Sequence, residues 1–539
     1  MSLVAGTATI ALVGAACSSD DEAAAAEAAS EFIAAGTPLY IEASTDVEGT
    51  QWTQAEALLQ RFPNAPSEGI TDVLNDAFDD EGIDYETQVQ PLLGGSVVLG
   101  ATPEVPTSLD GLNINVSDVN VGNATDSVDD TSVVIALELA EDAEDQAREL
   151  LTTEADVTEA GEHEGAAIYE SSDGDAFVSV VSGAIVIADT REGLERAIDA
   201  QRSGGEATIA GSDKFNAALG QLPEDTFGKI YIDLGRFVEQ AAAEDPDSAE
   251  SLRQLGDFSE LALAASVASE EEGIRLQGVI EGVPEGTETT SFSPSLLEHA
   301  PADAIAYVGF AGLADSVSQA VQQLRESEAN EELGTQLDAV TGQLPALLGV
   351  TVDDLGGLTS GEHAVVVAAR GGAPGAALAL EVEDGSRAQT TLDALRAATP
   401  SVGPQLGLPA GAEWSPVRLA DDVRGWQIPV GDGMSAVYGV EDDLAIVGTS
   451  PQIVRQVLNP QPTLADDPDF QAATEGMPDE ITGLLWLDPP ELLDAAEQGG
   501  ALDADDQEGV ETLQTIDGIA AWTIPGDTPT FEVFARIKG

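Results

Sequence analysis

The chain has 539 residues, with 19 basic and 99 acidic side chains and a formal net charge of −80 at pH 7. A surface this acidic repels a phosphate backbone, which excludes most modes of nucleic-acid binding. Hydrophobic residues make up 43% of the chain, so there is enough apolar material for folded cores and wholesale disorder is not expected. The length suggests roughly two to four domains.

The N-terminal segment carries the clearest signal of location. Residues 3–16 are apolar or small and uncharged, and the stretch is too short for a membrane-spanning helix of about 20 residues. The sequence Val13-Gly14-Ala15-Ala16-Cys17 then resembles a bacterial lipobox, and Cys17 is the only cysteine. We therefore predict a signal peptide with a lipobox over residues 1–17, lipid attachment at Cys17, and a body on the outer face of the cytoplasmic membrane. An N-terminal membrane anchor or an ordinary signal peptide is the alternative.

Residues 18–36 are acidic and rich in alanine and predict a tether.

Most of the remaining chain consists of two similar copies. They are predicted over 37–283 and 300–539, joined by a linker over 284–299. The matches keep their order and a nearly constant spacing. They include Tyr40 with Tyr307, Thr190 with Thr449, Arg196 with Arg455, Phe215 with Phe470, Tyr231 with Trp486, and Asp233 with Asp488.

Alternation and turn signals predict the same order of elements in each copy. In the first copy strands are expected at 38–43, 94–100, 132–139, 166–170, 175–181, 184–189, 227–233, 259–267 and 273–281, with helices at 51–61, 68–79 and 141–152. In the second copy strands are expected at 304–310, 362–369, 375–382, 424–429, 434–440, 443–448, 482–488, 516–524 and 529–537, with helices at 313–327, 330–347 and 384–397. Further helices should begin after Thr190 and after Ser450, which precedes Pro451.

Most of these strands follow one another in hairpins, without a helix between them. This order favours an α+β fold of two tandem homologous copies, each a mainly antiparallel sheet with helices packed on one face. The spacing also places an insertion within residues 102–130 of the first copy and a smaller one around 400–416 of the second.

Three stretches suggest a family. They are the run Thr37-Pro38-Leu39-Tyr40-Ile41-Glu42-Ala43, the run from Leu58 to Pro63, and the segment from Asp84 to Pro91-Leu92-Leu93-Gly94-Gly95. Together they resemble an uncharacterised bacterial envelope family, the domain of unknown function DUF3352. The resemblance implies a secreted or membrane-anchored protein and supplies no catalytic residue.

The sequence offers little that points to catalysis or metal binding. His163, His299 and His363 are far apart in sequence and are expected at the surface or at strand ends. The aspartates and asparagines of the 102–130 insertion could bind calcium, but a solvated loop explains them as well. We predict no metal site and no cofactor.

Asp233 and Asp488 follow equivalent strands in the two copies. Each is expected to cap the next helix, and the sequence Asp488-Pro489-Pro490-Glu491 is typical of a helix N-terminus. The alternative is a pair of carboxylates that act together in hydrolysis. The five tryptophans are expected to pack in the core or between the two copies. Trp486, for example, occupies a strand position that holds Tyr231 in the first copy.

These observations predict a lipid-anchored extracytoplasmic protein that is a non-catalytic binding or scaffolding module of the cell envelope. Its expected partners are the membrane, through the lipid anchor, and an unknown envelope protein or apolar ligand. One alternative is a carrier for an apolar, lipid-like ligand. Another, with less support, is a carboxylate-dependent hydrolase.

Overall fold

A computed structural model gives the structure of the chain. It describes residues 29–63, 65, 75, 84–102, 132–153, 157–172, 174–244, 258–283, 289–314, 341–369, 374–403, 408–409, 411–421, 423–431, 434–499 and 507–539. The predicted signal peptide, Cys17 and nearly all of the predicted insertion lie outside these residues. The predicted helices at 68–79, 313–327 and 330–347 also lie largely outside them.

The chain forms two compact units. Unit 1 comprises Met1–Glu285 with Asp527–Thr530 and Gly539, and unit 2 comprises Gly286–Gly526 with Phe531–Lys538. The division after Glu285 falls within the segment 284–299 that the sequence analysis treats as a linker.

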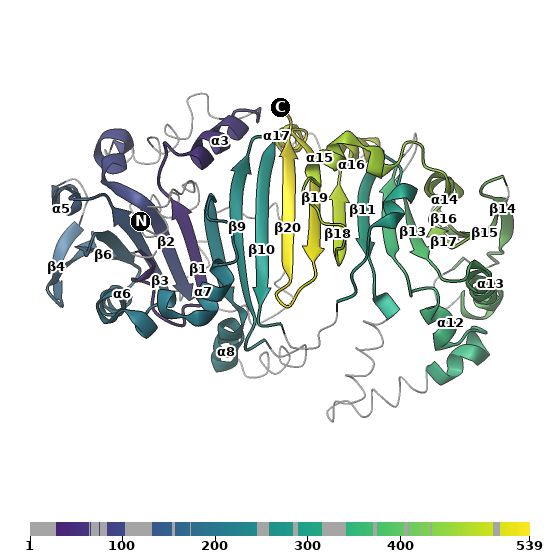
Figure 1. Ribbon diagram of the computed structural model, residues 1–539, viewed down its shortest axis with the longest axis horizontal. Helices are drawn as coiled ribbons and strands as arrows, with labels where there is room; N and C mark the ends of the chain where they lie inside the picture. The colour runs from purple at the N-terminus through teal and green to yellow at the C-terminus, as the bar shows by residue number, and fades with distance from the viewer. Residues whose placement is uncertain are drawn as a thin grey trace. The chain divides into compact units, whose positions relative to one another are not determined.

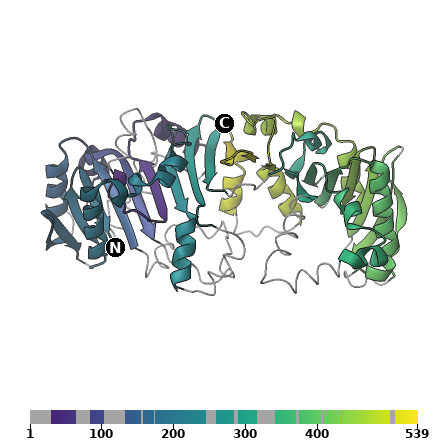
Figure 2. The ribbon, with the colours of Figure 1, turned by 60° about the horizontal axis from the view of Figure 1, so that its bottom comes forward.

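Unit 1 is built on ten described strands that lie side by side (Figures 1 and 2). They are β1 (Leu39–Ser44), β2 (Leu93–Thr102), β3 (Ser132–Leu139), β4 (Val157–His163), β5 (Ala166–Ser171), β6 (Phe177–Val181), β7 (Ala184–Ala188), β8 (Gly228–Asp233), β9 (Ala262–Glu270) and β10 (Gly273–Glu281). They pair in the order β4-β5-β6-β7-β3-β2-β1-β8-β9-β10, and every pair is antiparallel.

Unit 2 repeats this arrangement with ten described strands of its own. They are β11 (Ala304–Phe310), β12 (His363–Ala368), β13 (Gly375–Glu381), β14 (Ser415–Arg418), β15 (Arg424–Gly431), β16 (Met434–Glu441), β17 (Leu444–Gly448), β18 (Gly483–Leu487), β19 (Ile516–Ile524) and β20 (Thr530–Ile537). The pairing order is β14-β15-β16-β17-β13-β12-β11-β18-β19-β20, which matches unit 1 strand for strand. The prediction of an α+β fold with antiparallel sheets is confirmed.

The described helices occupy matching places between the strands. In unit 1 they are α3 (Thr50–Leu59), η1 (Tyr85–Val89), η2 (Gln90–Leu92), α5 (Glu144–Thr153), α6 (Arg191–Ser203), η5 (Gly205–Ala207), η6 (Ile209–Gly211), α7 (Asp213–Leu219) and α8 (Leu234–Glu244). In unit 2 they are η7 (Ser295–His299), α12 (Val352–Gly356), α13 (Gly385–Val402), α14 (Pro451–Leu458), η10 (Leu464–Asp466), α15 (Pro468–Ala473), α16 (Pro489–Gly499) and α17 (Gln507–Leu513).

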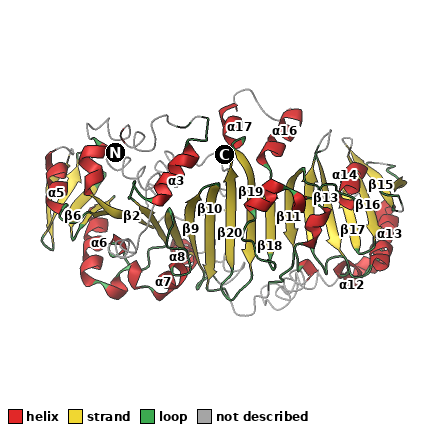
Figure 3. Ribbon diagram, turned by 45° about the horizontal axis from the view of Figure 1, so that its top comes forward, coloured by secondary structure: helices red, strands yellow, loops and turns green. Residues whose placement is uncertain are grey.

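Helices cover both faces of the unit 1 strands, so the prediction of helices on one face is wrong. Val98 belongs to a core that includes Leu194 of α6, whereas its neighbour Val97 belongs to a second core that includes Leu151 of α5. Consecutive strand residues point to opposite faces, so α6 and α5 lie on opposite sides of the strands (Figure 3).

The helices of unit 2 also pack in two separate cores. Ile453 of α14 packs in one core and Leu392 of α13 packs in another. The hairpin pattern specified antiparallel pairing, but it did not show that β2, β3 and their unit 2 counterparts are apolar on both faces.

Each unit also buries the segment before its first strand. Ala29, Phe32 and Ile33 are 1% exposed, although residues 29–36 fall within the range predicted as a tether. The Ile33 carbonyl accepts a hydrogen bond from the Ile209 amide at 2.8 Å. In unit 2 the Ala300 carbonyl accepts one from the Leu464 amide at 2.7 Å. Earlier in that segment, the Phe292 amide donates to the Ile481 carbonyl at 2.8 Å. These contacts make the segments 29–36 and 289–300 part of the folded units.

An aromatic cluster joins the first strand of unit 1 to a helix. Tyr40 of β1 is the strand partner of Tyr231 of β8, and both rings meet Phe215 of α7 edge-on, at 4.9 and 5.1 Å between centroids. In unit 2 Tyr307 pairs with Trp486, whose ring meets Phe470 edge-on at 5.4 Å. Edge-to-face pairs add about 0.5–1.5 kcal/mol each beyond the burial of their surface.

Candidate functional site

Asp233 and Asp488 both cap helices, as the sequence predicts. The Asp233 Oδ1 accepts a hydrogen bond from the Arg236 amide at 3.0 Å, at the start of α8. The Asp488 Oδ1 accepts one from the Glu491 amide at 2.9 Å, at the start of α16. The two carboxylates belong to different units, and each has a local structural partner.

The surroundings of these two caps differ in charge. Lys214 lies 2.9 Å from Asp233, whereas the position equivalent to Lys214 in unit 2 is Asp469. Burial raises the pKa of Asp488 from 3.8 to about 6, and the nearby carboxylates of Glu491, Asp467 and Asp469 act in the same direction. Its capping hydrogen bond opposes this rise.

The histidines lie apart from one another, as their spacing predicts. His163 ends β4 and lies 2.8 Å from Asp199, and His299 ends η7 and donates through Nδ1 to the Val457 carbonyl at 3.3 Å. His363 begins β12 and is 0% exposed, with no hydrogen-bond partner for either ring nitrogen in the described structure. His163 and His363 therefore do lie at strand ends, but His363 is not at the surface.

Sequence reasoning missed a buried carboxylate, Glu362, which is 3% exposed. It accepts hydrogen bonds from the amide and hydroxyl of Ser295, at 2.8 and 2.7 Å, and from the hydroxyl of Tyr307 at 3.3 Å. Burial raises its pKa, although the bonds from Ser295 and Leu296 oppose this rise. Glu362 thereby ties the segment before β11 to the start of β12, which is a structural role.

The tryptophans lie largely in the core. Trp486 and Trp522 are 1% exposed and Trp52 is 3% exposed, which confirms the prediction for these three. Trp414 and Trp426 are partly buried and pack against a core of unit 2 beside Tyr438. The guanidinium carbon of Arg396 lies 4.0 Å from the centre of the Trp426 ring.

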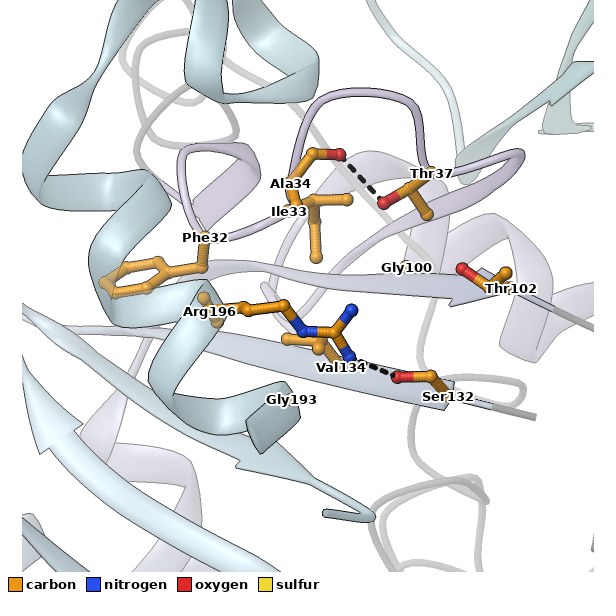
Figure 4. Close-up of a pocket in the computed structure, with 11 residues that line it drawn as sticks. Phe32, Ile33, Ala34, Thr37, Gly100, Thr102, Ser132, Val134, Gly193 and Arg196 are labelled. Carbon is orange, nitrogen blue, oxygen red and sulfur yellow. Dashed lines mark hydrogen bonds between the residues drawn. The ribbon is translucent and has the colours of Figure 1, made fainter. Parts of the chain in front are cut away.

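Unit 1 contains a small pocket between α6 and the segment that precedes β1 (Figure 4). Its volume is about 50 Å³, and Phe32, Ile33 and Val134 supply much of its wall. The Arg196 side chain extends from α6 to Ser132, where Nη2 donates to the hydroxyl at 3.3 Å. Gly100 also lines the pocket, and a Cβ there would lie 2.6 Å from Ile33, so this wall is tightly packed.

Unit 2 contains a larger cavity beside α14 and the segment that precedes β11. Its volume is about 260 Å³. The lining residues are Pro301, Asp303, Gln452, Arg455, Gln456, Asn459, Pro460, Gln461 and Pro462. The Nε and Nη2 of Arg455 donate to the Arg418 carbonyl at 3.2 and 3.1 Å.

These two pockets, one in each unit, are the candidate sites. The match of Arg196 with Arg455 that the sequence suggests is off by one residue. Thr190 caps α6 through the Gly193 amide and Ser450 caps α14 through the Ile453 amide. With the helices aligned on these caps, Arg196 corresponds to Gln456.

Residues before the first strand contribute to the wall of each pocket. In unit 1 these are Phe32, Ile33 and Ala34, which the sequence analysis placed in the tether, outside the first copy. Among the described residues there is no cluster of His, Cys, Asp or Glu that could hold a metal ion.

No helix within the described ranges is long and apolar enough to cross a membrane. The predicted lipid-attachment residue, Cys17, lies outside those ranges.

Comparisons with known proteins give a family and two distant structural matches. The model of the family described as "Protein of unknown function (DUF3352)" matches residues 1–521. A crystal structure of TP0453, form III, is 8% identical, with a TM-score of 0.25, and the match covers 46% of this chain and 78% of that one. Form IV of TP0453 is 10% identical, with a TM-score of 0.20, and the match covers 46% of this chain and 94% of that one. No curated protein matches the sequence.

Proposed function

The chain belongs to the DUF3352 family, and from its own residues we propose that it is a lipid-anchored extracytoplasmic binding protein of the cell envelope. The observation that carries the proposal is the lipobox-like sequence ending at Cys17, which is followed closely by a folded unit. Small residues before a cysteine suit the peptidase that processes bacterial lipoproteins, and the thiol then carries the lipid.

Ala29 is buried in the described core of unit 1, and residues 18–28 lie between it and Cys17 in the sequence. Eleven residues span at most about 40 Å when fully extended, at roughly 3.5 Å each. In this proposal unit 1 works close to the membrane surface.

We also propose that the two units arose by duplication of one ancestral unit. The identical pairing order of ten strands in each unit supports this origin. So do the matching helix caps, since Thr190 caps α6 and Ser450 caps α14. The isolated bridges Ala34 with Thr208 and Pro301 with Thr463 recur at equivalent positions as well.

The role we propose is binding without catalysis. The carboxylates that suggested hydrolysis, Asp233 and Asp488, are both engaged as helix caps. Each unit has a pocket beside α6 or α14, and these pockets support a binding role.

The test is protease treatment and crosslinking of the full-length chain in intact cells stripped of their wall. We expect external protease to degrade the protein while a cytoplasmic control protein stays intact, and we expect crosslinks to envelope components. A chain that is protected from external protease until the membrane is broken would contradict the proposed location. Crosslinks confined to cytoplasmic proteins would contradict it too.

A further inference from the structure

The unit 2 cavity is larger than the unit 1 pocket, at about 260 Å³ against about 50 Å³, and different segments line it. Gly100 and Val134, from β2 and β3, line the small pocket, whereas α14 and residues 459–462 border the unit 2 cavity. A site of this size with a polar lining is suited to a polar ligand of limited size.

The lining is rich in groups that both donate and accept hydrogen bonds. Four carboxamides contribute to it, from Gln452, Gln456, Asn459 and Gln461. Each carboxamide supplies two N–H donors and a carbonyl acceptor. One cationic side chain, Arg455, and one anionic side chain, Asp303, also line the cavity, so its formal charge is balanced.

Gln456 has a side-chain hydrogen-bond donor that no group in the described structure satisfies. Its Nε2 atom is buried and has no hydrogen-bond partner within the described structure. A buried donor without an acceptor is unfavourable, and the end of a glutamine side chain turns readily. A ligand oxygen in the cavity would satisfy this donor.

Arg455 is also prepared to donate further. Two of its N–H groups bind the Arg418 carbonyl, which fixes the guanidinium on the cavity wall. A guanidinium carries five N–H donors, so three remain for other acceptors.

We propose that the unit 2 cavity binds a neutral sugar residue of about the size of one pyranose ring. Sugar hydroxyls donate and accept, as the carboxamides do, and the three prolines offer apolar surface to the ring carbons. An anionic ligand is disfavoured by the net charge of −80 and by Asp303, and a cationic ligand by Arg455. The inference rests on the binding role proposed above and is independent of attachment through Cys17.

The test is saturation-transfer NMR on the full-length chain with D-glucose, D-galactose, D-mannose and N-acetyl-D-glucosamine as probes. We expect saturable transfer to at least one sugar. Gln456→Ala and Arg455→Ala should each weaken binding by about tenfold, the usual effect of losing a ligand hydrogen bond. Gln456 is only partly buried on α14 and alanine is a good helix former, so Gln456→Ala should fold, and thermal unfolding checks that it does.

Gln471→Ala is the matched control, because Gln471 is exposed on α15 and does not line the cavity. It should bind the sugar as the wild type does. The inference is overturned if no sugar shows transfer, or if transfer is the same in Gln456→Ala and in the wild type. Binding of L-alanine in place of the sugars, lost in the same variants, would overturn the sugar assignment. Any of these results leaves the protease test of the proposed location unaffected.

Discussion

Unit 2 has Trp486 at the strand position where unit 1 has Tyr231, and a neighbouring residue differs to accommodate the larger ring. Tyr231 pairs with Ala264 in unit 1, and Trp486 pairs with Ala520 in unit 2. Two residues before these partners stand Ala262 and Gly518, respectively. The larger indole needs the glycine, because a Cβ on Gly518 would lie 2.1 Å from the Trp486 ring.

Gly518→Ala should therefore destabilise unit 2. Overpacking a filled core costs typically about 1–3 kcal/mol, and here the ring cannot move without disturbing Phe470. Chemical denaturation of the purified chain measures the loss. Gly509→Ala is the control, since no atom lies within 4 Å of its added Cβ and it sits in helix α17. Equal stability of Gly518→Ala and the wild type would contradict the packing described.

Asp488 makes stability depend on pH. Its carboxyl has a pKa of about 6 in the folded chain against an ordinary value of 3.8, so the folded state holds a proton that the unfolded state releases. The contribution of Asp488 to stability is therefore greatest below about pH 4 and is lost as the pH rises through about 6.

Asp488→Asn keeps a capping oxygen and cannot ionise. We expect this variant to lose less stability than the wild type between pH 4 and pH 6.5, and to be the more stable of the two at neutral pH. Urea midpoints measured across this range provide the comparison. Parallel curves for the two proteins would show that the Asp488 carboxyl is not held in its neutral form.

At the scale of elements, local sequence signals placed most helices and strands. Strand 132–139 and strand 304–310 have the predicted bounds, and α6 and α14 start after Thr190 and Ser450 as expected. These elements carry clear turn residues, apolar alternation or caps, which act within a few residues of each other.

The elements that were missed have weak local signals. β4 and β14 pair with one neighbour each in the described structure, and most of their residues are partly or fully exposed. Such strands need no apolar face, so alternation cannot reveal them. The pairings of β1 with β8 and of β3 with β7 join distant segments, and local patterns do not specify them.

The caps of α6 and α14 should contribute to stability to the same extent. Thr190 accepts from the Gly193 amide and Ser450 from the Ile453 amide. Thr190→Ala and Ser450→Ala should each cost about 1 kcal/mol in the free energy of unfolding. Thr390→Ala, in the exposed middle of α13, should change it by less than about 0.5 kcal/mol. Loss of stability in only one of the two capping variants would argue against equivalent roles.

At the scale of the whole molecule, the repeat was detectable from sequence, because matched residues kept their order. The candidate sites were not, because each pocket is bordered by side chains from segments that are distant in sequence. Gln456 gains meaning only once α14 is known to border a cavity.

The net charge of −80 should make the folded chain sensitive to salt. Repulsion among surface carboxylates opposes the compact state, and at about 1 M salt the Debye length falls to about 3 Å, which screens most of it. We expect the thermal midpoint to rise between low salt and 1 M potassium chloride. A midpoint that is flat or falling over this range would show that the acidic surface does not limit stability.

The most direct test of the proposed function is metabolic labelling with radioactive palmitate, comparing the wild-type chain with Cys17→Ala. The account predicts that label enters the wild-type polypeptide and is absent from the variant, because Cys17 is the only cysteine in the chain. An unlabelled wild-type protein, or equal labelling of both, would contradict attachment through this residue.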